Sequence, residues 1–251
     1  MKIVNVNGAI GYPKKTMKPG RTAEELIHRM DVDGIDECVT YHHIAVRQMQ
    51  EGNAEMKLIA EASGGRIKPC FFVHPRLDGF QMPKAADLLA DLRRDRPAAV
   101  TLRPAEHGYP LDKMYCGELM EVLQELRIPV LLYNNATAVP EFMTRIPAIA
   151  KEFPKLPIVV IATSYTTSMF NYVCMKETEN ILLGIGGIES FCEVDHLVNT
   201  FGGHRFVISS TAGCISAGAL GMVYLGRFSQ EDKELILGGN WQRLQEEIKW
   251  A

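Results

Sequence analysis

Three side chains that could transfer protons follow two neighbouring apolar runs of the chain. His74 comes directly after the run 67–73, and Glu106 and His107 come a few residues after the run 98–102. Imidazole titrates near neutral pH, so a histidine beside a carboxylate can act as a general acid or base. His74, Glu106 and His107 are therefore the candidate catalytic residues. Two plainer alternatives stay open, a His74 bonded to a neighbouring loop and a Glu106–His107 pair solvated at the surface.

Two arginines, Arg76 and Arg103, follow the same two runs. A guanidinium group binds a carboxylate or a phosphate through two parallel hydrogen bonds. The arginines therefore favour a small polar, anionic molecule as the partner. Further polar side chains at the ends of apolar runs are expected to hydrogen-bond such a molecule: Asn5, Asn7, Tyr133, Asn134 and Thr211.

These residues need a scaffold that gathers strand ends in one place. Eight short apolar runs are nearly continuous, which indicates strands buried on both faces of a parallel sheet. The runs are 3–6, 37–41, 67–73, 98–102, 129–133, 157–161, 181–185 and 205–209. Between them, apolar residues three and four apart predict helices that cover the sheet. These helices begin after Thr22 and span 53–61, 84–94, 117–127, 139–153, 193–201 and 230–249. Thr22 and Glu25 have the spacing of a capping box.

Eight strands, each followed by a helix, predict a single (β/α)8 barrel, the TIM-barrel fold of the α/β class, as one domain over residues 1–251. We expect a distorted element around 163–175, which is rich in Ser, Thr and Tyr. An open, doubly wound sheet is the rival fold, and the lack of a Gly-x-Gly-x-x-Gly sequence after the first run disfavours it. In a TIM barrel the C-terminal ends of the strands form the active-site face, so the polar residues above would line one mouth.

The composition argues against several kinds of partner. The net charge is −3, and the longest basic stretch is Arg-Arg-Asp-Arg at 93–96, so nucleic acid is not expected. No run approaches the ~18 apolar residues of a transmembrane helix, and no signal-peptide pattern is visible. Six cysteines without a Cys-x-x-Cys pair are typical of reduced thiols. We expect a cytoplasmic protein without membrane contact, and a homo-oligomer stays open.

Several segments, taken in order, resemble the amidohydrolase-related enzymes. Phe-Val-His-Pro-Arg at 72–76 is similar to that family's third strand, and 99–104 with 109–111 is similar to its fourth strand and loop. Residues 128–133 are similar to its fifth strand, and 237–244 to its C-terminal helix. The resemblance covers nearly the whole chain, in the branch that includes carboxymuconate-semialdehyde and resorcylate decarboxylases. It implies a TIM barrel and, if activity is retained, a hydrolase or lyase.

The resemblance also implies where a metal ion would be held. The family's first strand carries Asp-x-His-x-His, where this chain has Asn5, Asn7 and Ala9. The remaining ligand positions fall on Tyr133, on Ala162 or Thr163, and on Thr211. An amide oxygen binds zinc weakly, and an alanine cannot bind it. We therefore expect no metal ion and no other cofactor.

Two classes of function follow from this reasoning. The first is an amidohydrolase-like barrel that has lost the metal-binding motif and holds a small, anionic molecule at the C-terminal ends of the strands. The alternative is an active hydrolase or decarboxylase, either metal-free through His74, Glu106 and His107 or with a rearranged metal site. A subunit that only assembles with an active partner is a third class that the sequence leaves open.

Overall fold

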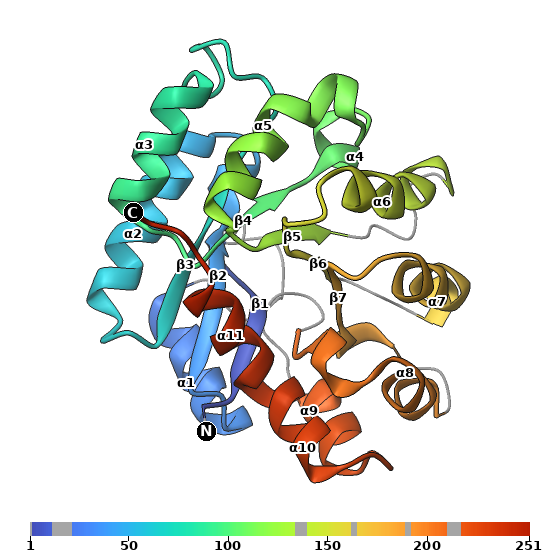
Figure 1. The fold of residues 1–251 in the computed structure, drawn as a ribbon. Coiled ribbons are helices and arrows are strands. Elements are labelled where there is room, and N and C mark those ends of the chain that lie inside the picture. The colour runs from blue at the N-terminus through green and yellow to red at the C-terminus, as the bar shows by residue number, and fades with distance from the viewer. Residues whose placement is uncertain (1, 12–21, 134–139, 162–164, 189–191, 210–216) are drawn as a thin grey trace.

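The computed structural model describes residues 2–11, 22–133, 140–161, 165–188, 192–209 and 217–251. Their core is one parallel sheet of eight strands in sequence order. The strands are β1 (Val4–Ile10), β2 (Glu37–His42), β3 (Ile67–Phe72), β4 (Ala99–Leu102), β5 (Val130–Tyr133), β6 (Ile158–Ile161), β7 (Ile181–Gly184) and β8 (Phe206–Val207). A bridge between Asn5 and Ile208 joins β1 to the end of β8. The sheet closes into the TIM barrel that the sequence predicted (Figure 1).

Helices surround the barrel (Figure 1). They are α1 (Ala23–Asp33), α2 (Met49–Ala62), α3 (Ala85–Asp95), α4 (Pro104–His107), α5 (Lys113–Leu126), α6 (Pro140–Glu152), α7 (Ser168–Glu177), α8 (Glu193–Phe201), α9 (Ala217–Tyr224), α10 (Gln230–Glu234) and α11 (Asn240–Glu246). A helix lies at each predicted place, and α8 has the predicted bounds. The helix predicted over 230–249 is divided into α10, a π-helix (Leu235–Gly239) and α11. The cap of α1 is also confirmed, because the Thr22 hydroxyl accepts a hydrogen bond of 3.2 Å from the Glu25 N–H.

The sequence did not indicate two of the short helices. Helix α4 begins with Pro104 and ends before Gly108, whose φ of 68° is left-handed, which is the usual way to start and stop a helix. This helical turn carries Glu106 and His107. Helix α9 lies at 217–224, where the sequence predicts no element. Where distortion was expected, the described residues form a 3-10 turn (Tyr165–Thr167) and then α7.

The C-terminal segment closes the end of the barrel where the strands begin. The Asn240 side chain donates 2.8 Å hydrogen bonds to the carbonyl oxygens of Gly203 and Phe206, just before and within β8. A Cβ at Gly238 would clash with the Lys2 carbonyl oxygen, so the π-helix Leu235–Gly239 and Lys2, two residues before β1, approach closely. These contacts leave the other end of the barrel, where the strands finish, to form a site.

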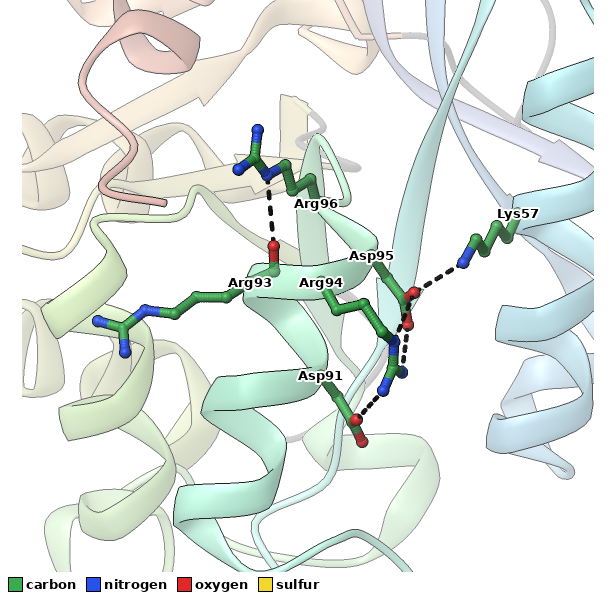
Figure 2. A network of polar contacts seen from close by, with 6 residues as sticks. All are labelled: Lys57, Asp91, Arg93, Arg94, Asp95 and Arg96. Carbon is green, nitrogen blue, oxygen red and sulfur yellow. Dashed lines mark hydrogen bonds and ion pairs between the residues drawn. The ribbon is translucent and has the colours of Figure 1, made fainter. Parts of the chain in front are cut away.

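The basic stretch at 93–96 is largely neutralised by acidic neighbours (Figure 2). Arg94 pairs with Asp91 at 2.7 Å and with Asp95 at 2.8 Å, and Lys57 of α2 pairs with Asp95 at 2.7 Å. The hydrogen bond from Arg94 is the main cause that lowers the pKa of the Asp95 carboxyl. These surface pairs connect α2 to α3.

Four cysteines are buried free thiols, in line with the reduced thiols that the sequence predicted: Cys38, Cys70, Cys116 and Cys174. Within the described residues, no helix is long and apolar enough to cross a membrane.

Candidate functional site

Arg103 lies at the mouth of the barrel in a cage of aromatic rings. It follows β4 directly and is only 5% exposed. Its guanidinium carbon lies 5.0 Å from the ring centre of Tyr41, 5.6 Å from that of Phe72 and 3.9 Å from that of Tyr133. These rings stand at the C-terminal ends of β2, β3 and β5. We call Tyr41, Phe72 and Tyr133 the aromatic cage, and its ring faces stabilise the cation.

The guanidinium group of Arg103 uses one of its nitrogens and leaves one edge unpaired. Nη1 pairs with Oε1 of Glu106 at 3.1 Å. Nε and Nη2 are buried and have no hydrogen-bond partner in the part of the chain that the structure describes. These two nitrogens lie on one edge of the planar group and can donate in parallel to the two oxygens of a carboxylate.

Arg103 keeps its charge despite its burial. Burial alone would lower the pKa of the guanidinium, but Tyr41, Glu106 and Tyr133 more than compensate and raise that pKa above its ordinary value. Burial has the opposite effect on an acid: it raises the pKa of the Tyr133 phenol, so this side chain stays neutral. The mouth therefore holds a permanent buried cation beside neutral aromatic rings.

Two histidines next to this cage present opposite hydrogen-bonding groups. The His107 Nε2 lies 2.8 Å from the Val46 carbonyl oxygen, which can only accept, so Nε2 carries the hydrogen. His107 Nδ1 is then the acceptor, and it is buried without a partner among the described residues. His74 Nδ1 accepts a 3.1 Å hydrogen bond from the Arg76 N–H, so the neutral His74 ring carries its hydrogen on Nε2. The ring centres lie 5.7 Å apart.

The electrostatics keep His74 neutral, with Tyr109 packed beside it. Burial, and then the neighbouring His107 and Arg76, lower the pKa of His74 below its ordinary value. The Tyr109 ring centre lies 5.0 Å from that of His74, and burial raises the pKa of the Tyr109 phenol. A donor on His74 Nε2 and an acceptor on His107 Nδ1 can act as general acid and general base in one step.

The structure brings together five of the residues selected from the sequence. They form one continuous cluster, because the Phe72 ring of the cage also lies beside the His107 ring, with 6.3 Å between the ring centres. The five residues are His74, Glu106, His107, Arg103 and Tyr133. The sequence reasoning did not single out Phe72, Tyr109 or the Val46 carbonyl group. The positions of Phe72 and Tyr133, at the ends of the strands on either side of β4, could have indicated their contact with Arg103.

The other selected residues lie elsewhere. Asn5 and Asn7 are buried in β1, and the Asn5 side-chain oxygen accepts a 3.2 Å hydrogen bond from the Asn7 N–H. The exposed Arg76 side chain pairs with Asp78 at 2.7 Å and lies over the Phe80 ring. Asn134 and Thr211 lie outside the described residues. The roles of these five residues remain predictions.

The described residues at the family's metal positions, Asn5, Asn7, Ala9 and Tyr133, include no carboxylate or imidazole that could bind a divalent cation. The Asn5 amide oxygen is already engaged by Asn7, and Ala9 offers no ligand atom. At the fifth-strand position, the Tyr133 ring packs 3.9 Å from the positive Arg103 guanidinium, which would repel a metal ion. Ala162, Thr163 and Thr211 lie outside the described residues, and the rest contain no group of three His, Cys, Asp or Glu that could hold a metal. The absence of a cofactor stays a prediction.

A cavity of about 550 Å³ lies elsewhere, on the outside of the barrel between α2 and α3. Its floor is apolar and includes Phe71 and Val73 of the β3 segment, and the Lys57, Asp91, Arg94 and Asp95 ion pairs line one side. Because those charges neutralise one another, we place the candidate site at Arg103, where buried donors have no partner.

Comparisons with known proteins agree with the fold. The chain matches no protein-family profile and no curated protein sequence. Among solved structures, it resembles an uncharacterised TIM-barrel protein from Bordetella bronchiseptica (TM-score 0.73, 15% identity, 98% of this chain and 99% of that chain). It also resembles 5-carboxyvanillate decarboxylase from Sphingomonas paucimobilis (TM-score 0.71, 13% identity, 99% of each chain). A third match is 4-oxalomesaconate hydratase from Rhodopseudomonas palustris (TM-score 0.70, 15% identity, 98% and 96%).

These likenesses define the class of fold. The chain is a TIM barrel of the kind found in amidohydrolase-related decarboxylases and hydratases, as the sequence resemblance predicted. At such low identity, the likeness concerns the fold alone.

Proposed function

We propose that this protein binds a small carboxylate at the mouth of the barrel, with Arg103 as the anchor. The observation that carries this proposal is the unpaired edge formed by Nε and Nη2, buried within the described part of the chain. A buried donor without an acceptor costs about 1–3 kcal/mol. An anion that accepts from both nitrogens would recover that free energy, and Glu106 fixes the guanidinium from its other side.

The charge balance favours a singly charged ligand over a dianion. Arg103 contributes one positive charge, and Glu106 already offsets much of it at 3.1 Å. Burial also lowers the pKa of His74 and of the nearby His43, so these rings add little positive charge at neutral pH. A monocarboxylate with a flat, apolar body would pair with the guanidinium edge and contact the aromatic cage.

The names of similar proteins support a carboxylate as the ligand, whereas its single charge is inferred from the residues of this chain alone. 5-Carboxyvanillate and 4-oxalomesaconate, on which two of the structural neighbours act, are both carboxylates. Where the amidohydrolase-related first strand carries Asp-x-His-x-His, this chain has Asn5, Asn7 and Ala9, and Arg103 can supply a cation for the carboxylate in place of a metal ion.

Calorimetric titration with acetate, benzoate and inorganic phosphate tests the proposal. We expect benzoate to bind the wild type and Arg103→Gln to weaken it about 10- to 100-fold, because a hydrogen bond to a charged group is worth about 1.5–3 kcal/mol. Arg94→Gln, which changes an arginine on the outer face, is the matched control and should leave the affinity unchanged.

Three results would contradict the proposal. The first is equal benzoate affinity in the wild type and in Arg103→Gln. The second is a loss of binding in Arg76→Gln but not in Arg103→Gln, which would move the anchor to the exposed arginine. The third is binding of phosphate alone, which would exclude the carboxylate.

The histidine pair favours a second candidate function, metal-free acid–base catalysis on the bound carboxylate. His107 Nδ1 could take a proton from a carbon next to a carbonyl group while His74 Nε2 donates one to the carbonyl oxygen. The C–H electron pair would then form the double bond of an enol, and the reverse step would return a proton to carbon. Such a step belongs to the hydrolase and lyase chemistry that the sequence resemblance implies.

Proton exchange in heavy water tests this second function. Pyruvate has an acidic C–H group beside its carbonyl, and its methyl signal in proton NMR disappears as deuterium replaces hydrogen. We expect the wild type to speed this exchange in the presence of a chelator and His107→Gln to lose the effect. If pyruvate binds but exchanges no faster than in buffer, the pair does not catalyse proton transfer.

A further inference from the structure

Two neighbouring residues of α2, Gly52 and Asn53, contact the two segments that hold the histidine pair. Gly52 packs against the 3-10 turn His43–Val46, which we call η1, and η1 ends at the carbonyl group that binds His107. Asn53 bonds the backbone of Phe72, the last residue of β3, two residues before His74. This short stretch of α2 thus contacts the backbone segments that position both histidines.

Gly52 allows η1 to lie directly on the helix. A Cβ at this position would clash with the backbone nitrogen and the Cβ of Ala45. Glycine inside a helix costs roughly 1 kcal/mol relative to alanine, so its presence in the first turns of α2 requires a local reason. Hydrogen bonds of 3.0 and 2.9 Å from the N–H groups of Arg47 and Gln48 to the Ile44 carbonyl oxygen close η1 on itself. Close packing on Gly52 then sets the place of the Val46 carbonyl group.

Asn53 takes the place of a missing strand partner. The ladder between β2 and β3 runs from Cys38–Ile67 to Thr40–Pro69, and β2 then turns into η1. On Phe72, beyond that ladder, the Asn53 side chain accepts from the N–H at 2.8 Å and donates to the carbonyl oxygen at 2.9 Å. This two-sided contact fixes the end of β3, and with it the start of the segment that carries His74.

We propose that Gly52 and Asn53 are positioning residues for the histidine pair: Gly52 holds His107 in one tautomer through Val46, and Asn53 holds His74 in place through Phe72. The inference rests on the proposed function only for the use made of the histidines. The proposal predicts two separate effects, because Gly52 and Asn53 act on different histidine rings through different stretches of backbone.

Nitrogen-15 NMR of the histidine rings at neutral pH tests the proposal without any ligand. The two rings are assigned with His74→Gln and His107→Gln. In the wild type we expect both as single tautomers with the hydrogen on Nε2. Gly52→Ala should convert His107 to a mixture of tautomers and leave His74 unchanged. Asn53→Asp, which accepts from Phe72 N–H but cannot donate to its carbonyl oxygen, should shift the His74 signals and leave His107 unchanged.

Matched controls separate positioning from general damage. Gly221→Ala changes a glycine inside α9 that has open space around its Cβ position. Asn199→Asp changes an exposed asparagine that also donates to two carbonyl oxygens. Both should leave the two rings unchanged. If Gly52→Ala does not fold, Ala45→Gly, which loosens the contact of η1 with Gly52 without adding an atom, takes its place and should likewise convert only His107 to a mixture of tautomers.

The outcomes are distinguishable from those of the proposed function. The proposal would be overturned if the folded variants left the NMR signals of both histidines unchanged. It would also be overturned if each substitution changed the signals of both histidines alike. Benzoate titration of the same variants reports separately on Arg103. Retained binding with unchanged tautomers would refute the positioning role alone, and altered tautomers without any benzoate binding in the wild type would refute the carboxylate proposal alone.

Discussion

Two buried arginines lie at opposite ends of this barrel, and they differ in how their nitrogens are used. Arg205, just before β8, is 5% exposed, as is Arg103. Arg205 donates from Nε to the Ile181 carbonyl oxygen at 2.9 Å and from Nη2 to that of Thr178 at 2.7 Å, and its Nη1 lies 3.4 Å from a Glu179 oxygen. Among the described residues, the nitrogens of Arg103 have one such oxygen partner, in Glu106.

On the proposed function, the difference separates a structural arginine from a binding one. The nitrogens of Arg205 are paired with oxygen atoms of the chain itself, so these contacts contribute to the free energy of folding. Among the described residues no oxygen atom pairs with the free edge of Arg103, and we propose that a bound carboxylate does so. Removal of the two arginines should therefore affect different measurements.

The largest expected effect is on stability. Arg205→Met should lower the free energy of unfolding by about 3 kcal/mol, because carbonyl groups that it now binds would be buried without a donor. Arg103→Met should change it by less than about 1 kcal/mol, because the lost contacts with Glu106 and the ring faces are offset by the removal of two buried donors that have no partner among the described residues. Urea unfolding of both variants measures the two changes in the free energy of unfolding. A loss in Arg103→Met as large as that in Arg205→Met would show that Arg103 is structural as well.

The next effect concerns the aromatic cage. Tyr133→Leu removes the ring that lies closest to the guanidinium, and a cation–π contact is worth about 0.5–2 kcal/mol. We expect benzoate affinity to fall several-fold, because the guanidinium edge would no longer be held in place. Tyr133→Phe keeps the ring and is the matched control. If both variants bind alike, the ring does not position Arg103.

A smaller effect concerns pH. Because burial lowers the pKa of His74 in the folded protein, the unfolded chain binds a proton more readily as the pH falls. The contribution of His74 to stability is therefore complete above about pH 6.5, the ordinary histidine value, and is lost as the pH falls below it towards the folded-state pKa. His74→Gln should unfold with a weaker dependence on pH between 7.5 and 5.5. An unchanged or steeper dependence would contradict the neutral His74 assigned here.

The smallest effect expected is that of metal ions. Freshly purified protein should hold far less than one zinc per chain, and a chelator should leave benzoate binding unchanged. Elemental analysis measures the first and calorimetry the second. If the protein instead held about one tight zinc per chain and Asn7→Ala lost it, this chain would have the metal site of the amidohydrolase-related enzymes. Arg103 would then not be needed as the cation.

The strand ends could be found from the sequence, but the pairing of polar atoms could not. Continuous apolar runs define buried parallel strands, and the rule that sites form where strands finish selected Arg103, His74 and His107. The same rule also selected Arg76, whose side chain pairs with Asp78 in the structure. One residue type at one strand end can point into the mouth or along a loop, and only the backbone beyond the strand decides between them.

The tautomers of the histidines depend on groups that carry no sequence signal. The Val46 carbonyl group is available to His107 because η1 packs on Gly52, and any residue could supply such a carbonyl. The turn of α4 likewise arises from Pro104 and Gly108 at its ends, and it brings Glu106 back to Arg103. The sequence could indicate which side chains meet, whereas the free edge of Arg103 required the structure.

The most direct test of the central claim follows the Nε–H signals of the two buried arginines by NMR while benzoate is added. With protein labelled at arginine Nε, and with signals assigned through Arg103→Gln and Arg205→Lys, the account predicts that the Arg103 Nε–H signal moves to the position of a charge-assisted hydrogen bond and saturates with benzoate. The Arg205 signal should stay where it is. An Arg103 signal that does not move at saturating benzoate, or a shift at Arg205 instead, would contradict the account.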